Sequence, residues 1–364
     1  MRKIRVLIVD DSVVIRRLLT DILKEDPDIE LAGTAPNGKL ALAKLPQLNP
    51  DIVTLDIEMP ELDGLGTLPE LRKTYPKLPV IMFSTLTERG AKATFDALAL
   101  GATDYVAKPA NVGNVSAGIE IVKAQLLPKI KALCPQAIPS AGTTGRMVAR
   151  PQLPGAERRL PQSCEVVIVG SSTGGPQALA SILAGLPAEF PVPIVVVQHM
   201  PPVFTKHLAD RLNQICTLQV SEATTGEELL PGRVLIAPGG YHLEFERQGL
   251  AIRTVLQQGP LENSCRPAVD VTFRSAAKVF GSGCLAAVLT GMGQDGLRGA
   301  QDIYLVGGTV LTQDEATSVV WGMPRAVAVA GFSHQSLPLP RIAGELTRMV
   351  TALRRRSPLL ERIT

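Results

Sequence analysis

The stretch Ile4-Arg5-Val6-Leu7-Ile8-Val9-Asp10-Asp11 places an apolar run directly before two carboxylates. Four further apolar runs follow, at residues 29–33, 52–55, 80–83 and 105–107, and amphipathic stretches separate them. Fully apolar strands that alternate with helices are typical of a parallel sheet covered on both faces. Five such units in about 130 residues predict a flavodoxin-like (βα)5 domain over residues 1–131.

The α/β alternation returns after Cys164. Apolar runs predict parallel strands at residues 166–169, 194–197, 234–237, 285–289 and 309–311. Residues 241–245 and 250–255 predict a β-hairpin. We therefore expect a second domain over residues 164–350, doubly wound and mainly parallel.

The segments outside these two domains differ from them in composition. Residues 132–163 contain five prolines and three glycines and show no helical or strand period, which predicts a linker. As a flexible coil this linker would span roughly 30 Å. Residues 351–364 include the run Arg354-Arg355-Arg356 and are expected to form a basic tail.

Composition excludes several classes of protein. Lys and Arg (37) exceed Asp and Glu (34) by only three, which gives no case for binding nucleic acid. The chain has no apolar stretch of 18 residues, and its first apolar run ends at Asp10, so neither membrane insertion nor a signal peptide is expected. The five cysteines are scattered and never spaced C-x-x-C, which favours free thiols in a reducing cytoplasm over disulfides or a zinc site.

Polar side chains follow the strands predicted in the first domain. They are Asp10 and Asp11, Asp56, Ser84 and Lys108. Because the carboxyl ends of parallel strands meet at one edge, these groups are expected to converge. Clustered carboxylates suit Mg²⁺, and a metal-bound carboxylate facing a lysine is suited to attack a phosphoryl donor. The alternative, that each Asp only caps the next helix, stays open for any one of them.

This pattern resembles the receiver domain of two-component response regulators, over residues 1–131. The resemblance implies that Asp56 accepts the phosphoryl group and that Asp10, Asp11 and Asp56 bind Mg²⁺. It also implies a set of switch and phosphate-contacting residues: Ser84, Tyr105 and Lys108. Ser84 stands where many receivers carry Thr, and the hydroxyl is kept.

In the second domain, the first predicted strand leads into Gly170-Ser171-Ser172-Thr173-Gly174-Gly175-Pro176. A dinucleotide site would need G-x-G-x-x-G and a P-loop would need Gly-Lys-Ser/Thr, so a serine nucleophile beside an oxyanion site fits this loop better. His199 and Asp295 also follow apolar strands and would reach the same edge of the sheet. The remaining histidines and several acids are expected to pack, cap helices or face solvent: His207, His242, His334, Asp270, Asp302 and Asp314.

Five segments resemble the catalytic domain of bacterial chemotaxis protein-glutamate methylesterases. They are residues 170–175, Gln198-His199-Met200-Pro201, Ser264-Cys265-Arg266-Pro267-Ala268-Val269-Asp270, residues 289–296 and Gly322-Met323-Pro324. The resemblance implies Ser172 as nucleophile, His199 as base and Asp295 as the acid that orients it. It also implies oxyanion donors from two backbone N–H groups, those of Thr173 and Met292.

The two resemblances together imply a phosphorylation-activated hydrolase that controls adaptation in chemotaxis. It would demethylate glutamate methyl esters on methyl-accepting receptors and deamidate receptor glutamines, with a chemotaxis histidine kinase as phosphodonor. Mg²⁺ would serve the receiver alone, and the ester hydrolysis would need no cofactor. The simplest switch is steric, with the unphosphorylated receiver covering the edge that carries Ser172.

Two other outputs are disfavoured. A DNA-binding output would show a helix-turn-helix with a basic face, and residues 164–335 are instead Gly-rich α/β sequence with no basic cluster. A nucleotide-binding output lacks its glycine fingerprint.

Overall fold

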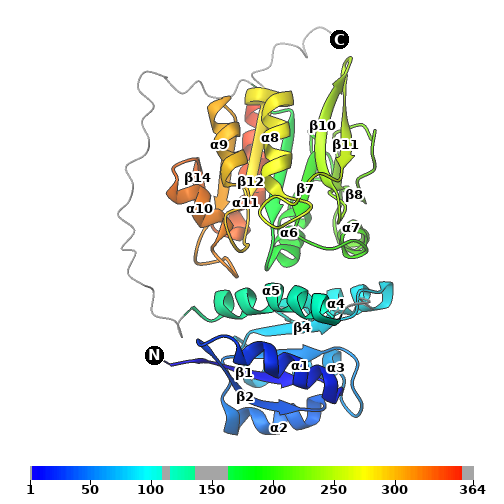
Figure 1. Cartoon of the computed structure of the whole chain (residues 1–364). Helices are drawn as coiled ribbons and strands as arrows, with labels where there is room; N and C mark the ends of the chain where they lie inside the picture. The colour runs from blue at the N-terminus through cyan, green and yellow to red at the C-terminus, as the bar shows by residue number, and fades with distance from the viewer. Residues whose placement is uncertain (1, 109–114, 136–162, 355–364) are drawn as a thin grey trace. The chain divides into compact units, whose positions relative to one another are not determined.

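The structure is a computed structural model of the chain, and it describes residues 2–108, 115–135 and 163–354 (Figure 1). It contains two compact units, divided between Thr144 and Gly145. Most of the predicted linker, Pro109 and the tail from residue 355 lie outside the described residues. The proposed domain limits therefore stay predictions.

The sheet of the first unit has five strands in the order β2-β1-β3-β4-β5, and every neighbouring pair is parallel. The strands are β1 (Ile4–Val9), β2 (Ile29–Ala35), β3 (Ile52–Asp56), β4 (Val80–Ser84) and β5 (Asp104–Ala107). This is the flavodoxin-like order. The prediction of a (βα)5 domain is confirmed, and the predicted strands fall within the observed ones.

Five helices accompany this sheet: α1 (Val13–Lys24), α2 (Gly38–Leu48), α3 (Gly64–Thr74), α4 (Glu88–Ala99) and α5 (Val115–Leu133). α1 contacts α5, whereas α3 contacts α2 and α4, so the helices cover both faces of the sheet. The first four helices begin at residues whose side chains accept a backbone N–H of the first turn: Ser12, Asn37, Asp63 and Thr87. Such caps satisfy N–H groups that have no partner within the helix.

The sheet of the second unit has seven strands in the order β14-β13-β12-β6-β7-β9-β8, again all parallel. The strands are β6 (Val166–Ser171), β7 (Ile194–Gln198), β8 (Gln219–Glu222), β9 (Arg233–Ile236), β12 (Cys284–Val288), β13 (Thr309–Gln313) and β14 (Gln335–Leu337). Five of them match the predicted apolar runs. The two edge strands, β8 and β14, were not predicted, because both are short and largely polar.

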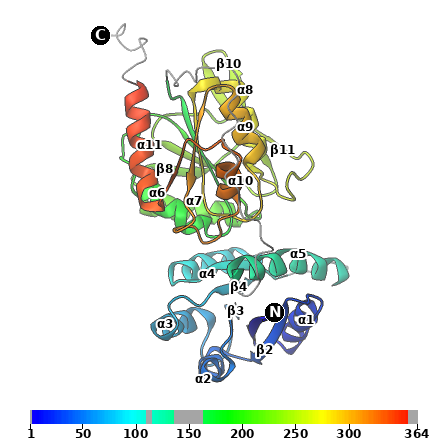
Figure 2. The same ribbon diagram turned by 90° about the vertical axis from the view of Figure 1, so that its left-hand side faces the viewer.

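The predicted hairpin is confirmed as β10 (His242–Gln248) and β11 (Ala251–Gln257), which pair antiparallel. The helices of this unit are α6 (Gly175–Ala184), α7 (Phe204–Ile215), α8 (Val269–Phe280), α9 (Leu297–Leu305), α10 (Met323–Val329) and α11 (Leu339–Arg354). α6 contacts α7 and α11 on one face of the sheet, and α8, α9 and α10 lie on the other (Figure 2). α11 continues to Arg354, four residues into the segment expected to be a tail.

The order of strands in this sheet reverses direction at β6. From β6 the chain continues to β7 on one side, and from β12 it continues to β13 on the other. In open α/β sheets the crevice between two such strands, at their carboxyl ends, is the preferred site for ligands. The loops that follow β6 and β12 are therefore the first place to look for a functional site.

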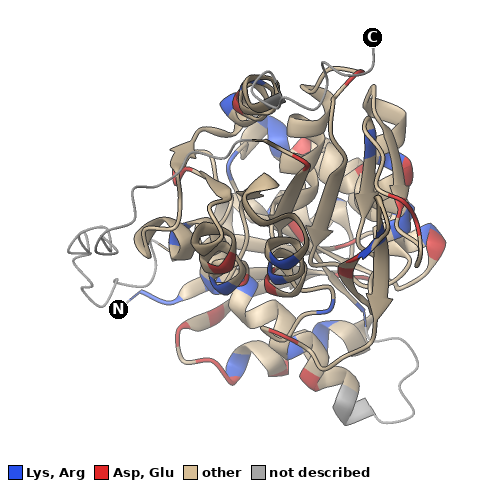
Figure 3. Ribbon diagram, turned by 90° about the horizontal axis from the view of Figure 1, so that it is seen from above, with Lys and Arg blue, Asp and Glu red and all other residues tan. Residues whose placement is uncertain are grey.

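None of the helices within the described residues is long and apolar enough to cross a bilayer. In the view of Figure 3, basic and acidic residues are interspersed along the helices and strands.

Close packing between β6 and α8 depends on Gly170. A Cβ at this position would lie 2.5 Å from a methyl carbon of Val269, so Gly170→Ala should lower the stability of the second unit by about 1–3 kcal/mol. Urea unfolding followed by the fluorescence of Trp321, the single tryptophan, measures this. Gly344→Ala is the matched control, because its Cβ would meet no atom within 4 Å. Equal midpoints for Gly170→Ala and the parent would contradict the prediction.

Candidate functional site

An acidic cluster lies at the carboxyl edge of the first sheet. Ligand oxygens of Asp10, Asp11 and Asp56 all lie within 4.8 Å of one another. Lys108 Nζ lies 2.8 Å from Asp56 Oδ1 and 3.2 Å from Asp10 Oδ2. Asp10 and Asp56 are buried, whereas Asp11 is exposed. The structure thus brings the three predicted carboxylates and the predicted lysine together.

The charges in this cluster do not balance. Burial and the nearby charge of Asp10 raise the pKa of Asp56 to about 6, although the ammonium of Lys108 opposes this. Burial likewise raises the pKa of Asp10. Among the described residues, the buried Asp10 Oδ2 has no well-directed hydrogen bond. Three carboxylates that share a single ammonium fit a hard divalent cation such as Mg²⁺.

The two predicted switch residues lie on β4 and β5, the strands that follow β3 in the order of the sheet. Ser84 ends β4 and is buried, with its Oγ donating to the carbonyl of Gly90 at 3.1 Å. Tyr105 lies on β5 and is largely buried. Burial raises the pKa of its phenol well above the ordinary value, so the hydroxyl stays protonated.

Ser172 follows β6 directly and begins the loop to α6. Its N–H donates to the carbonyl of Thr290 at 3.0 Å, and its carbonyl accepts the N–H of Gly175 at 2.8 Å. Gly291 packs against it so closely that a Cβ there would lie 2.8 Å from Ser172 Cβ. The loops after β6 and β12 are therefore in direct contact, and Ser172 is half-buried at that contact.

The neighbouring Ser171 has a different environment. It is fully buried, and its Oγ donates to Gln198 Oε1 at 2.7 Å. The amide of Gln198 then donates to the carbonyl of Ser172 at 2.9 Å. Ser171 is thus part of the support for the loop, and Gln198 couples that loop to the end of β7.

His199 follows β7, which pairs with β6 so that Gln198 lies opposite Ser171. Ser172 and His199 therefore directly follow the paired ends of two adjacent strands. His199 Nε2 lies 2.7 Å from Asp295 Oδ2. The structure brings His199 and Asp295 into contact, and no hydrogen bond joins His199 to the Ser172 hydroxyl in the described part of the chain. Such bonds are often loose before substrate binds.

The carboxylate of Asp295 is held by the N-terminus of α8. Its Oδ2 accepts the N–H of Val269 at 2.6 Å, and its Oδ1 accepts the N–H groups of Asp270 and Gly296 at 2.9 and 3.0 Å. The side chain of Asn263 donates to Oδ1 as well, at 2.8 Å. A helix N-terminus stabilises negative charge, so this carboxylate is fixed as an anion with one oxygen facing the histidine.

These contacts change the proton affinity of both partners. Burial raises the pKa of Asp295, but the hydrogen bond and charge of His199 and the backbone donors of α8 outweigh it, and the net pKa is lowered. Burial lowers the pKa of His199, yet the hydrogen bond to Asp295, together with the side chain of Cys265, raises it overall. Asp295 therefore stabilises the protonated form of the His199 imidazole.

The two predicted oxyanion donors belong to the two loops that meet at Ser172. Thr173 is buried and follows Ser172 in the loop, and its carbonyl accepts the hydroxyl of Thr290 at 2.9 Å. Met292 is half-buried and follows Gly291, and its N–H donates to no atom among residues 2–108, 115–135 and 163–354. The segment at Gly322 fixes this turn, because the N–H groups of Gly322 and Met323 both donate to the carbonyl of Gly291.

The other polar residues lie in environments that differ from one another. His242 is buried, with Nε2 2.9 Å from the carbonyl of Pro260, as a packing residue would be. Asp270 is not solvated: it is buried, and its Oδ1 accepts the N–H of Gly299 in the first turn of α9. Sequence reasoning missed Asn263, which lies just before the quoted segment 264–270, and it assigned no role to Gln198 although that residue precedes His199.

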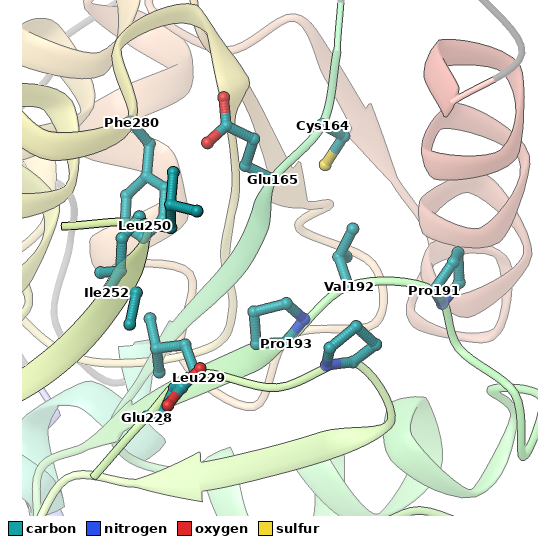
Figure 4. A pocket seen from close by; sticks show the side chains of 12 residues that line it. Cys164, Glu165, Pro191, Val192, Pro193, Glu228, Leu229, Leu250, Ile252 and Phe280 are labelled. Atoms are coloured by element: carbon teal, nitrogen blue, oxygen red, sulfur yellow. The ribbon is translucent and has the colours of Figure 1, made fainter. Parts of the chain in front are cut away.

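A separate pocket lies at the opposite edge of the second sheet (Figure 4). Its lining includes Cys164 and Pro193, which precede β6 and β7, as well as Phe280 at the end of α8. Since Ser172 and His199 follow the same two strands, this pocket is not part of the site.

The first unit thus has the fold and acidic cluster of a response-regulator receiver, and the second is an α/β unit with Ser, His and Asp at one edge of its sheet. Comparison with known proteins agrees. Residues 6–120 match the response regulator receiver domain family and residues 167–346 match the CheB methylesterase family.

Full-length relatives carry one name. The chain is 52% identical over 355 residues to the protein-glutamate methylesterase/protein-glutamine glutaminase of Trichodesmium erythraeum, covering 96% of this chain and 100% of the relative. It is 53% identical over 357 residues to the enzyme of that name from a Nocardioides species, covering 97% of each. The CheB methylesterase catalytic domain of Thermotoga maritima aligns with a TM-score of 0.51 and 47% identity, over 52% of this chain and 100% of that one. The chain belongs to the protein-glutamate methylesterase/protein-glutamine glutaminase family.

The environments of the two adjacent serines predict effects of different size on stability. Ser171→Ala removes the donor to a buried oxygen of Gln198 and should cost about 1–3 kcal/mol of unfolding free energy. Ser172→Ala removes a half-buried hydroxyl and should change it by less than about 0.5 kcal/mol. Urea unfolding followed by Trp321 fluorescence compares the two. A larger loss for Ser172→Ala than for Ser171→Ala would contradict the assignment of Ser171 to loop support.

Proposed function

We propose that this chain hydrolyses glutamate methyl esters on methyl-accepting chemotaxis receptors, deamidates receptor glutamines, and is activated by phosphorylation. The hydrogen bond between His199 and Asp295 is the observation that carries the proposal, because it lies beside the Ser172 loop at the switch point of the sheet. The names of the full-length relatives support the choice of ester and amide. A carboxamide is close in shape to a methyl ester, so one site can accept both.

The proposed reaction has two halves. His199 takes the proton from Ser172 Oγ, which attacks the γ-carbonyl carbon to form a tetrahedral oxyanion. As that intermediate collapses, the protonated His199 donates its proton to the leaving methoxide or amide, and methanol or ammonia departs. Water then attacks the acyl-enzyme with His199 again as base, which releases the glutamate side chain and restores Ser172.

Each residue of the site has a defined part in these steps. Since Nε2 of His199 faces Asp295, Nδ1 is the nitrogen left to serve Ser172. Asp295 stabilises the imidazolium that forms when the serine proton is taken. The N–H groups of Thr173 and Met292 are the proposed oxyanion donors. Their support is their position, one directly after the nucleophile and the other directly after Gly291, which packs on it.

The test of the nucleophile is methanol release from methylated receptor membranes. Ser172→Ala and His199→Gln should each lower kcat by about 10⁶-fold, and Asp295→Ala by about 10⁴-fold, because an orienting carboxylate leaves nucleophile and base in place. Ser171→Ala should keep most of the activity at a temperature where it is folded. Equal methanol release by Ser171→Ala and Ser172→Ala would contradict the assignment of Ser172.

In the receiver, Asp56 is the proposed phosphoacceptor. Asp10, Asp11 and Asp56 are the proposed Mg²⁺ ligands. A bound cation would lower the raised pKa of Asp56 and keep its carboxylate ionised for attack. Lys108 would contact the phosphoryl oxygens, and Ser84 and Tyr105 would respond to them. The partners on this proposal are a chemotaxis histidine kinase and the receptors, and the site of action is the cytoplasm.

Control by the receiver predicts opposite results for two variants of the chain. Asp56→Ala should stay at the basal rate with phosphodonor and Mg²⁺, whereas Asp21→Ala, an exposed carboxylate on α1, should be activated like the parent. A fragment starting at Ser163 should be active without phosphodonor, by up to about 100-fold over the unphosphorylated chain if that chain is 99% inhibited. A fragment slower than the unphosphorylated chain would show that the receiver activates and does not inhibit.

A further inference from the structure

We propose that Asn263 and Asp270 are positioning residues that hold the Asp295 carboxylate in line with His199. The inference rests on the proposed function, because it assigns a role in the same reaction. Neither residue reaches the nucleophile; both act through Asp295.

Asn263 lies between two buried carboxylates. Its Nδ2 donates to Asp295 Oδ1 at 2.8 Å and to Asp270 Oδ2 at 2.9 Å, so each hydrogen of one amide group serves one acid. Asn263 and the next residue, Ser264, have positive φ values of 51° and 61°. Two consecutive non-glycine residues in the left-handed region are costly, and such strain persists where surrounding contacts require it. Here those contacts are the two hydrogen bonds of the amide.

Asp270 is held from three directions. Its Oδ1 accepts the N–H of Gly299 at 2.7 Å, its Oδ2 accepts the Asn263 amide, and its own N–H donates to Asp295 Oδ1 at 2.9 Å. Gly299 lies in α9, the helix that follows the Asp295 loop. Asp270 therefore links the starts of α8 and α9 and fixes the amide that contacts Asp295.

Charge explains why an amide is needed at this point. Burial and the charge of Asp295 raise the pKa of Asp270 to about 6, and the bonds from Gly299 and Asn263 oppose that rise. The other acid facing Asp270 is Glu262, whose carboxylate is bound by Arg274 at 2.7 Å. Without a donor between them, Asp270 and Asp295 would repel each other. With it, Oδ1 of Asp295 is fully engaged and Oδ2 is directed to His199.

The sequence allows a test that separates positioning from mere structural support. Asn263→Asp and Asp270→Asn are nearly isosteric substitutions, and each removes the hydrogen bond between residues 263 and 270. The double variant restores a bond between residues 263 and 270 with the roles exchanged, but it leaves a carboxylate at 263 facing Asp295. If the bond between 263 and 270 served stability alone, the double variant would recover both stability and activity.

We expect methanol release by the full chain, with phosphodonor and Mg²⁺, to show kcat lowered by about 10- to 100-fold in Asn263→Asp with KM changed less than about twofold. The double variant should recover part of the urea midpoint lost by the single variants, because it restores the bond between 263 and 270, and should keep the low kcat. Two exposed controls, Asn213→Asp and Asp210→Asn, should match the parent. Recovery of kcat by the double variant would overturn the proposal.

A second measurement needs no substrate. The pKa of His199, followed by NMR of the histidine rings and assigned by the loss of its signal in His199→Gln, should rise in Asn263→Asp and fall in Asp270→Asn. The reason is that the first adds a negative charge beside Asp295 and the second removes one. Unchanged His199 titration in both variants would overturn the proposal. If the parent chain released no methanol, the proposed function would fail while this titration still decided the role of Asn263 and Asp270.

Discussion

The candidate esterase site depends on the contacts of the Asp295 carboxylate with the N-terminus of α8 and with His199. This carboxylate accepts two backbone N–H groups of that helix and one ring nitrogen of His199. The helix needs acceptors for its first N–H groups, and the histidine needs a fixed anion to define which ring nitrogen holds its proton. One side chain meets both needs, so the position of α8 and the orientation of the His199 ring depend on the same carboxylate. Gly170 contributes to the packing of α8, because its lack of a side chain allows this helix to lie close to β6.

The acidic cluster of the first unit also contains buried carboxylates, but their hydrogen-bond partners differ. Asp10 and Asp56 are buried and face each other with a single ammonium, that of Lys108, between them. Burial raises the pKa of both acids, and one buried oxygen has no well-directed hydrogen bond in the described part of the chain. Asp295 accepts hydrogen bonds from several protein donors, whereas the three carboxylates of this cluster share one ammonium. On the proposed function, this difference separates a carboxylate that orients a base from a carboxylate cluster that binds a metal and reacts.

The second unit also shows how much of a catalytic edge consists of residues that do no chemistry. Gln198 ties the Ser172 loop to β7, and Gly291 with Gly322 brings the loop after β12 against Ser172. Glycines are required at these two positions because any Cβ would meet backbone or side-chain atoms closer than 3 Å. Part of the motifs that carry the family resemblance is therefore needed for the close packing of these loops.

The sequence by itself determined the two α/β units, the hairpin and most strands, because apolar runs of strand length between helical stripes have few other solutions. It also placed the chemically distinctive residues at strand ends, where a parallel sheet must bring them to one edge. The edge strands β8 and β14 were not predicted, because short polar strands are specified by the neighbour with which they pair. Tertiary structure alone decided that Asp270 is buried, that Asn263 lies between two acids and that Gln198 braces the loop. These roles arise from contacts between segments distant along the chain, in which position, not residue type, determines the partner.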